Sequence, residues 1–473
     1  MKKCATMLMM FVFTVLLVSC DISLGPIASV KGQNYESFER LFDDTKVKTL
    51  RVIITKEKWD ELDNAMIDYF VRHGHYRTDY MVEANLEFTD QEGIVDIERI
   101  GFRTRGNMSR DRIQNDEGEP QFQNFKISFH EDYTPEISKR TVFELEEIDL
   151  KGNRNYDETY LTEKFSLDLM KSFGVFAAQT TLVKFLITIG DQTYDYGVYT
   201  AFEPIDDNFI KRRLTKEASD GHLYKSLWQN FGPANLGYIQ NNRAIGIKNE
   251  AINYRPTYDL KTRKWEENHT NLREFIDKIN GYNNHDFIQY IEENFEVDMF
   301  LRYLAVGALL GNPDDYRAMG NNYYLYQNAS TQKWMIIPYD YDHGMGQGWN
   351  GGGLFEDWSV GLDIYDWANV NAHLLGQPNY PHVLVDRILS YETYQLTYES
   401  YLAELINPEN NYFTQASFMS LYEEQKALYD NLLVNSMINN LAFGLRNVMT
   451  YIDDKTKAIE QQLTFYQTNP DQR

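Results

Sequence analysis

Short acidic and amide side chains gather in two glycine-rich turns, within GNPDDYRAMGNNYYLY at residues 311–326 and PYDYDHGMG at residues 338–346. Carboxylate and amide oxygens are ligands for hard cations, and a carboxylate can also accept a proton from a hydroxyl group. The two turns therefore predict a cation site or phosphate-transfer chemistry. The residues of interest are Asp314, Asn321, Asn322, Asp340 and Asp342.

The two turns are joined by a predicted β-hairpin, with strands at 322–327 and 333–340. An antiparallel hairpin returns its second strand to the start of the first, so the polar groups at that end should converge. Magnesium suits such a site, because it is held by one or two carboxylates plus phosphate oxygens. An EF-hand is excluded, since Gly344 and Gly351 stand where that motif needs acidic or amide ligands, and His343 alone does not predict a zinc site.

The order of these groups is that of the second half of a protein-kinase site, in which a catalytic aspartate, a metal-binding asparagine and a later metal-binding aspartate follow one another. Kinases use the spacing D-x-x-x-x-N. Here Asn322 lies 322 − 314 = 8 positions after Asp314, so the loop is longer. The alternative is a turn rich in Asp and Asn for local hydrogen-bonding reasons.

Basic residues in the first half of the chain add to this pattern. The loop around GFRTRGNMSR suits phosphate oxygens, because glycine frees backbone amides beside guanidinium groups. It is not a Walker loop, since Asn107 stands where lysine is needed. Lys126 lies on the polar face of the next predicted strand, and Glu163 on the following helix is a candidate partner for it. The candidate phosphate-binding residues are Arg103, Arg105, Gly106, Asn107, Ser109 and Arg110.

The first residues predict secretion and lipidation. Residues 1–19 have a positive start and an apolar stretch, which is typical of a signal peptide and too short for a comfortable membrane span. LVSC, ending at Cys20, is similar to a bacterial lipoprotein box, and residues 20–33 predict a tether. We therefore expect an extracytoplasmic lipoprotein, at the periplasmic or outer surface of the membrane, anchored through lipid on Cys20. The alternative is an ordinary secretory signal peptide.

Composition and periodicity indicate a globular α+β protein with two parts. The formal net charge of −24 makes a broad nucleic-acid-binding surface improbable. Residues 34–205 predict mainly strands, among them an alternating strand at 121–130, and residues 206–473 predict mainly helices. A β-rich lobe followed by a helical lobe would place a cleft between them.

The sequence resembles the CotH family of spore-coat kinases over about residues 45–350. The matching stretches are RGNMS, NFKISF, LKGNRNYDET, YGVYTAFEPIDDNFIKRR, GHLYKS, LLGNPDDYRAMGNNYYLY and WMIIPYDYDHGMG. The resemblance implies an atypical protein-kinase-like fold with two lobes, which binds ATP with Mg²⁺ and phosphorylates a hydroxyl group, on a protein or another acceptor.

The resemblance also implies roles for single residues. Asp314 matches the catalytic aspartate, and Asn322 and Asp340 match metal ligands, with Asp342 as a second carboxylate at the metal. The other residues implied to bind ATP are Arg105, Gly106, Asn107, Ser109, Lys126, which matches the phosphate-holding lysine, and Glu203 near the hinge.

Two other functions remain open from the sequence. A kinase-like fold could serve as a non-catalytic surface module that binds a glycan or protein, since aromatic residues make up 14% of the chain. The third possibility is a structural protein of the cell envelope with a calcium-stabilised turn. A catalytically idle scaffold has no reason to keep the whole set of Lys126, Asp314, Asn322 and Asp340.

Overall fold

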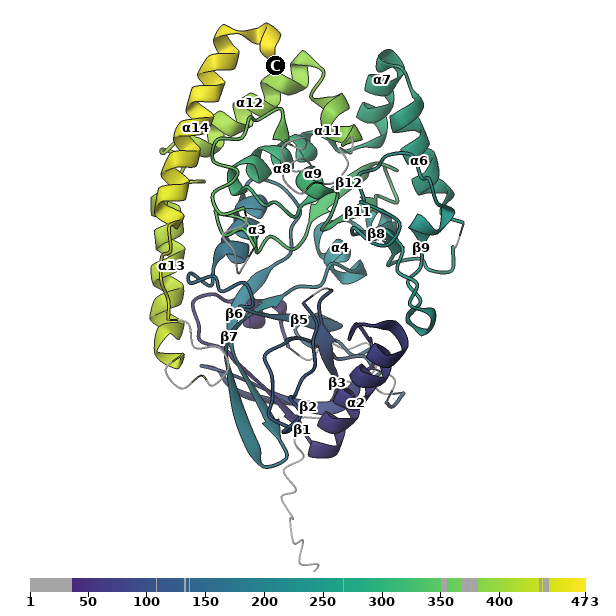
Figure 1. Cartoon of the computed structure of the whole chain (residues 1–473), viewed down its shortest axis with the longest axis vertical. Helices are drawn as coiled ribbons and strands as arrows, with labels where there is room; N and C mark the ends of the chain where they lie inside the picture. The colour runs from purple at the N-terminus through teal and green to yellow at the C-terminus, as the bar shows by residue number, and fades with distance from the viewer. Residues whose placement is uncertain are drawn as a thin grey trace, which may run out of the picture.

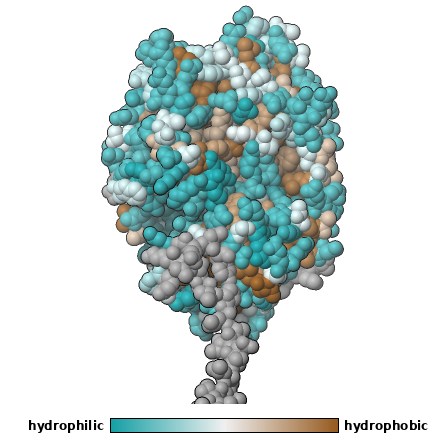
Figure 2. Space-filling model, turned by 180° about the vertical axis from the view of Figure 1, so that it is seen from behind, coloured by the Kyte–Doolittle hydropathy of each residue, from teal (hydrophilic) through white to brown (hydrophobic). Residues whose placement is uncertain are grey.

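The computed structural model describes residues 36–473, apart from 108, 132, 136, 267, 350–354, 368–375, 377–381, 434–435 and 437–441. The predicted signal peptide at 1–19, the lipidation site Cys20 and the tether at 20–33 lie outside the described residues. Within the described part of the chain, no helix is long and apolar enough to cross a membrane. The surface seen from behind is mainly hydrophilic, with apolar side chains interspersed (Figure 2).

A closed β-barrel forms the first half of the described chain, in the lower part of Figure 1. Its strand order is β1-β2-β3-β4-β5-β7-β6, and it closes because β1 pairs in parallel with β6. The strands are β1 (Thr49–Ile54), β2 (Val82–Asp90), β3 (Gly93–Arg105), β4 (Asn124–Ser128), β5 (Glu147–Gly152), β6 (Thr180–Ile189) and β7 (Gln192–Phe202).

Alternation along the strands separates the barrel core from a charged outer face. In β4, Phe125 and Ile127 are fully buried in the core, so Lys126 between them points outward, as the sequence predicts. Antiparallel pairing sets Lys126 opposite Arg103 of β3 and Asp149 of β5. The barrel therefore presents a row of charged side chains on the outside of β3, β4 and β5.

The second half contains a five-stranded sheet packed among helices. Its order is β12-β11-β8-β10-β9, and its largest apolar cluster is formed mainly with the helices, joined by Leu182, Val198 and Phe202 of the barrel. The region expected to be mainly helical therefore carries more sheet than the predicted hairpin alone. These strands are β8 (His222–Ser226), β9 (Ile245–Gly246), β10 (Tyr258–Leu260), β11 (Tyr323–Gln327) and β12 (Trp334–Pro338).

The helices are concentrated in the second half, in the upper part of Figure 1. Those before β8 are α1 (Phe38–Phe42), α2 (Lys56–His73), α3 (Thr162–Ser172), α4 (Asp207–Arg213) and α5 (Lys216–Ser219). Those after it are α6 (Thr270–Gly281), α7 (Asn284–Asn294), α8 (Val297–Leu310), α9 (Tyr316–Met319), α11 (Val383–Ile388), α12 (Glu392–Ile406), α13 (Gln415–Tyr429) and α14 (Val448–Thr468). Short 3₁₀ turns lie at η1 (Asn242–Ala244), η2 (Glu250–Ile252), η3 (Asp430–Leu432) and η4 (Pro470–Gln472).

The C-terminal helices join the two halves along one side of the molecule (Figure 1). The hydroxyl of Tyr429 in α13 donates to the carbonyl of Leu182 in β6 at 2.6 Å, and Gln425 donates to the carbonyl of Asp44 at 3.0 Å. Helix α14 packs on α12 and α13. The last ninety residues therefore hold the barrel against the helical part, a role that the sequence alone does not reveal.

Candidate functional site

The predicted hairpin is confirmed, and it brings the two polar turns together. Strands β11 and β12 pair antiparallel with Tyr323 opposite Pro338, and the backbone N–H of Tyr339 donates to the carbonyl of Asn322 at 3.2 Å. Asn322 and Asp340 thus lie at the same end of the hairpin. Both have left-handed backbones, with φ of 52° and 64°, which Asn and Asp tolerate better than most residues.

Asp314 is held in the same place by amide groups. Helix α8 ends at Gly311, and the following turn carries Asp314 back over the hairpin end. Its carboxylate accepts hydrogen bonds from the side-chain amides of Asn321 at 2.8 Å and Asn322 at 3.0 Å. Two neutral donors therefore fix the orientation of this carboxylate, and no lysine or arginine among the described residues forms an ion pair with it.

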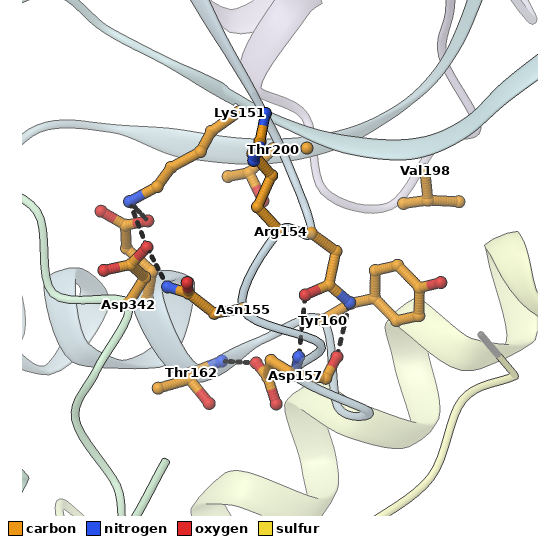
Figure 3. A pocket seen from close by; sticks show the side chains of 12 residues that line it. Lys151, Arg154, Asn155, Asp157, Tyr160, Thr162, Val198, Thr200 and Asp342 are labelled. Carbon is orange, nitrogen blue, oxygen red and sulfur yellow. Dashed lines mark hydrogen bonds and ion pairs between the residues drawn. The ribbon is translucent and has the colours of Figure 1, made fainter. Parts of the chain in front are cut away.

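Lys151 of β5 lies at the centre of these acids, and we call Lys151, Glu163, Asp314, Asp340 and Asp342 the acid cluster. Its ammonium nitrogen is 2.8 Å from a carboxylate oxygen of Glu163 in α3, 2.8 Å from one of Asp342, and also paired with Asp340. Figure 3 shows the lysine reaching down from the strand toward Asp342. One strand, one helix and the segment after β12 thus supply the ammonium and its three ion partners.

Three acids of this cluster have the arrangement of a cation site. Glu163, Asp340 and Asp342 each offer one carboxylate oxygen, and the three oxygens lie within 4.8 Å of one another. Carboxylate oxygens at this spacing suit magnesium or another hard cation. The predicted ligands Asp340 and Asp342 are therefore together, Glu163 joins them, and Asn322 contacts Asp314.

Burial and crowding of charge shift the pKa values in the cluster. Burial alone would lower the pKa of Lys151, but Asp340, Asp342 and Glu163 outweigh it and raise that pKa well above its usual value. Burial raises the pKa of Glu163 to about 7, against the opposing effect of Lys151. Burial also raises the pKa of Asp314 to about 7. A single ammonium group therefore does not neutralise all four acids.

Two polar groups support Asp342 from the other side. The side-chain amide of Asn155 donates to its carboxylate, and an imidazole nitrogen of His343 lies 3.5 Å from it. The other ring nitrogen of His343 is 2.9 Å from the carbonyl of Gly348, which requires an N–H there. Burial lowers the pKa of His343, but Asp342 and Asp314 outweigh it and the net pKa is raised. This histidine acts as a packed, hydrogen-bonded ring.

The expected pairing of Lys126 with Glu163 is wrong. The Lys126 ammonium pairs with Glu147 and lies 3.1 Å from Asp149, whereas Glu163 pairs with Lys151. Both lysines point outward from neighbouring strands, but only β5 leads directly into α3. Lys126 lies in the row of charges beside the acid cluster, and its part in ATP binding stays a prediction.

The predicted phosphate loop follows β3, next to that row. Arg105 donates to the hydroxyl of Tyr339 at 2.6 Å and lies 3.4 Å from Asp149, so it adjoins the acid cluster. Gly106 has a φ of 115°, a backbone conformation that other residues rarely adopt. Asn107 and Ser109 are exposed. A phosphate-binding role for these four residues stays a prediction.

Glu203 lies in a closed ion network. Its side chain is fully buried, and its carboxylate pairs with Arg212 and Arg213, each at 2.6 Å. It also accepts a hydrogen bond from the backbone N–H of Gln179 at 2.9 Å. Direct contact between this carboxylate and a nucleotide would require these bonds to break, so the geometry supports a structural role at this bend of the chain.

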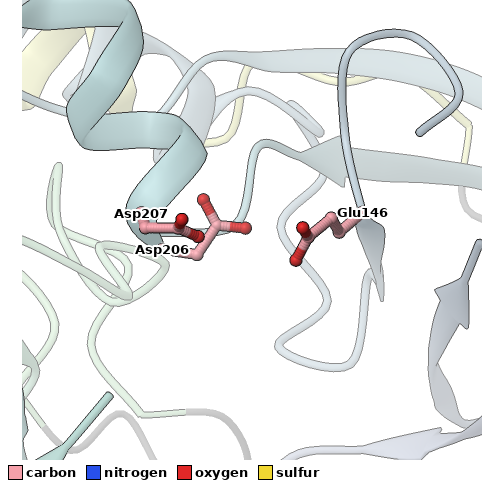
Figure 4. A group of neighbouring side chains, drawn as sticks. All are labelled: Glu146, Asp206 and Asp207. Atoms are coloured by element: carbon pink, nitrogen blue, oxygen red, sulfur yellow. The ribbon is translucent and has the colours of Figure 1, made fainter. Parts of the chain in front are cut away.

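A second group of acids lies nearby, at the start of α4 (Figure 4). Carboxylate oxygens of Glu146, Asp206 and Asp207 lie within 4.8 Å of one another, and all three residues are half-buried. Asp206 accepts the backbone N–H of Phe209 at 2.9 Å and so caps α4. Asp206 is therefore engaged in helix capping.

A cavity opens beside the acid cluster (Figure 3). It has a volume of about 40 Å³ and lies between β5, β7, α3 and the loop after β5, and Lys151, Glu163 and Asp342 are among its lining residues. Arg154 reaches into it and donates to the side chain of Gln123 at 3.0 Å. The acid cluster is therefore reachable from solvent.

Sequence reasoning missed two lysines of this region. Lys151 stands on the strand that directly precedes the helix of Glu163, and this strand-to-helix order was the available signal. The ammonium nitrogen of Lys225 in β8 lies 4.1 Å from the ring centre of Tyr339. Its charge helps to lower the pKa of Asp149. No local pattern marks Lys225, because its neighbours come from other strands.

Two known proteins are similar to this chain. The chain is 23% identical over 269 residues to the inner spore coat protein H of Bacillus subtilis (strain 168), which covers 56% of this chain and 64% of that relative. The chain thus matches less than two thirds of the relative's length. A proinflammatory kinase CtkA of Helicobacter pylori is 11% identical, with a TM-score of 0.25, over 69% of this chain and 92% of that one.

The family model described as CotH kinase protein matches residues 102–470. This range starts and ends later than the predicted 45–350, and it includes the C-terminal helices that join the two halves. The expected resemblance is confirmed over more than half of the sequence, and the chain belongs to the CotH kinase protein family.

Proposed function

We propose that this protein is a kinase that transfers phosphate from ATP, with Mg²⁺, to a hydroxyl acceptor, on a protein or another molecule, in a two-lobed kinase-like fold. One observation carries the proposal. The acid cluster joins a strand lysine, a helix glutamate, an amide-held aspartate and two hairpin-end aspartates, which is the set that phosphoryl transfer uses.

Lys151 and Glu163 correspond in this proposal to the lysine–glutamate pair of kinases. The lysine holds phosphate oxygens of the nucleotide, and the glutamate 2.8 Å away keeps its ammonium in place. Asp314 accepts the proton of the acceptor hydroxyl. Its carboxylate is already oriented by Asn321 and Asn322, so little reorganisation is needed at the moment of transfer.

The acids fit a divalent cation, because three carboxylate oxygens converge within 4.8 Å. Asp340, Asp342 and Glu163 would hold it, with Asn322 beside them. Magnesium bound there would neutralise charge on the phosphates during transfer. Arg105 and Lys126, on the outer face of the barrel, would extend the positive surface along which the nucleotide lies.

The test is phosphate transfer from radiolabelled ATP, with a cell-envelope fraction as acceptor. Asp314→Asn should still bind Mg–ATP but transfer phosphate at least about a thousandfold more slowly. The matched control is Asp207→Asn, which changes the same group near the surface of the second acid group. If wild type shows no transfer and no thermal stabilisation by Mg–ATP, the kinase proposal fails, and stabilisation by a glycan instead would favour a binding module.

We further propose that the protein acts outside the cytoplasmic membrane, anchored through lipid on Cys20. This rests on the apolar start of the chain and on LVSC at residues 17–20. Fractionation of cells should find wild type with membranes and Cys20→Ala in the soluble extracytoplasmic fraction. Equal membrane association of both would contradict the anchor.

A further inference from the structure

A second charged group, of opposite sign, lies at the β3 side of the barrel's charged face. It forms where the segment after α2, the end of β3 and residues 248–255 meet. One carboxylate, that of Asp79, is surrounded by basic side chains. We call this group the arginine cluster, and its basic members are Arg77, Arg103, Arg110, Lys248 and Arg255.

Asp79 pairs with only part of the cluster. Its carboxylate is 3.4 Å from Arg103, 4.0 Å from Arg110 and also paired with Lys248. Arg77 and Arg255 make no ion pair with a described carboxylate. Arg77 donates to the amide oxygen of exposed Asn107, and Arg255 donates to the side chain of Asn253 at 3.1 Å.

The cluster has more positive than negative charge. Three of the five cations pair with Asp79, and a second acid, Glu250, accepts a hydrogen bond from Thr78. The whole chain has a net charge of −24, so this local excess of positive charge is opposite in sign to the charge of the chain. Like charges at short range repel unless an anion lies between them.

Buried hydrogen-bond donors in the cluster lack acceptors. The Nε–H groups of Arg77, Arg103 and Arg110 are buried without a hydrogen-bond partner. The Arg110 side chain is only 5% exposed, so water does not replace the missing acceptor on most of its surface. A buried donor without an acceptor destabilises the folded state, more so when it is charged, so three in one place point to a missing acceptor.

Titration behaviour agrees with an excess of positive charge. Burial, with Arg103 nearby, lowers the pKa of Arg110 to about 9 despite Asp79. Burial also lowers the pKa of Lys248 to about 8. Burial is the main cause of both shifts, and neighbouring arginines add a smaller lowering.

We propose that the arginine cluster binds a phosphate group, at a site separate from the acid cluster. Guanidinium groups match phosphate oxygens in shape and charge, and several of them around one anion are typical of phosphate recognition. Strand β4 lies between β3, which carries Arg103, and β5, which carries Lys151. The phosphate comes from one of two sources, the tail of the nucleotide or a second phosphorylated ligand.

The test measures binding of inorganic phosphate and pyrophosphate to the full mature chain by calorimetry and by thermal unfolding, against sodium chloride at equal ionic strength. Wild type should bind phosphate. Arg255→Gln should bind it about tenfold more weakly, because one charge-assisted contact is lost. Arg51→Gln is the matched control, since Arg51 pairs one-to-one with Glu87 elsewhere on the barrel. It should bind phosphate as wild type does.

Unfolding without phosphate separates binding from a purely structural role. Arg255→Gln removes one positive charge from a cluster with excess positive charge, so without phosphate its unfolding temperature should equal or exceed that of wild type. The rise in unfolding temperature caused by phosphate should be smaller than in wild type. If Arg255→Gln is less stable by the same amount with and without phosphate, or if phosphate does not stabilise wild type beyond chloride, the proposal is overturned.

Competition identifies the source of the phosphate and keeps this inference independent of the kinase proposal. In Asp340→Asn, magnesium-dependent ATP binding should weaken while phosphate binding persists. Phosphate that competes with ATP indicates the nucleotide tail, and phosphate that binds together with ATP indicates a second ligand. Loss of phosphate binding in Asp340→Asn would contradict a separate site.

Discussion

The acid cluster and the arginine cluster are built on opposite plans. In the first, one ammonium group of Lys151 pairs with three carboxylates, and in the second, one carboxylate of Asp79 is surrounded by basic side chains. Each central group neutralises only part of the charge around it. The charge of the acid cluster therefore favours a further cation, and the charge of the arginine cluster favours a further anion.

The difference shows how the fold separates charge along one face. Strand β5 carries the lysine that faces the acids, and β3 carries an arginine of the basic group, with β4 between them. In the two proposals above, the acid cluster would hold a metal ion and the arginine cluster a phosphate group. A chain of uniformly spread negative charge would offer neither.

The largest expected effect separates the two lysines on the barrel. Lys151→Met should lower phosphate transfer by about a hundredfold or more, because the ammonium that contacts Glu163 and Asp340 is lost. Lys126→Met should lower it less than about tenfold, since Lys126 pairs with Glu147 instead. Steady-state kinetics with both variants checks this. Equal losses would mean that both lysines hold the nucleotide, and a larger loss in Lys126→Met would reverse the assignment.

The next effect tests the opposite plans through stability. Lys151→Met leaves the Glu163 carboxylate, which is only 10% exposed, and its neighbours Asp340 and Asp342 without their cation, and it should lower the free energy of unfolding by about 3–5 kcal/mol. Asp79→Asn should cost less, about 1–3 kcal/mol, because the Asp79 side chain is 34% exposed. Magnesium should restore the free energy of unfolding of Lys151→Met, and phosphate should restore that of Asp79→Asn. Urea unfolding with each salt measures this, and equal responses of both variants to both salts would indicate mere screening.

A buried lysine outside both clusters shows the effect of burial on a charge that has no carboxylate partner among the described residues. Lys455 of α14 is fully buried, donates to the carbonyl of Ser359 at 2.6 Å, and has its pKa lowered to about 7 by burial and then by Arg317. The unfolded chain, with the ordinary lysine pKa of 10.5, binds the proton more tightly than the folded chain above pH 7. The contribution of Lys455 to stability therefore becomes more favourable as pH rises from about 7 to about 10.5.

The variant Lys455→Met removes this dependence. The free energy of unfolding of wild type minus that of Lys455→Met should rise by about 2–3 kcal/mol between about pH 7 and about pH 9. Chemical denaturation at both pH values measures the difference. A constant difference would mean that Lys455 keeps its proton in the folded protein, as Lys151 does beside its carboxylates.

Several parts of the site could be predicted because they depend on neighbours in the sequence. The alternation around Lys126 fixed its outward direction, and the hairpin between 322–327 and 333–340 placed Asn322 and Asp340 together. Strand periodicity and antiparallel pairing act over a few residues, so they are visible without any tertiary contact.

Other parts depend on packing between distant segments. Lys126 and Lys151 have equivalent places on adjacent strands, and only the position of α3 decides that Glu163 meets Lys151. Glu203 fits a hinge in sequence, but two arginines of α4 enclose it. The arginine cluster is drawn from three segments, and no spacing along the chain relates them.

The amino-acid sequence by itself determined the acidity of the chain, the outward faces of its strands and the meeting of its two polar turns, because hydrogen-bond pairing and side-chain alternation are local properties. The tertiary structure decided the closure of the barrel, the lysine at the centre of the acids and the basic group around Asp79. These contacts form only when separate elements pack, since burial then brings together charges that are far apart in the sequence.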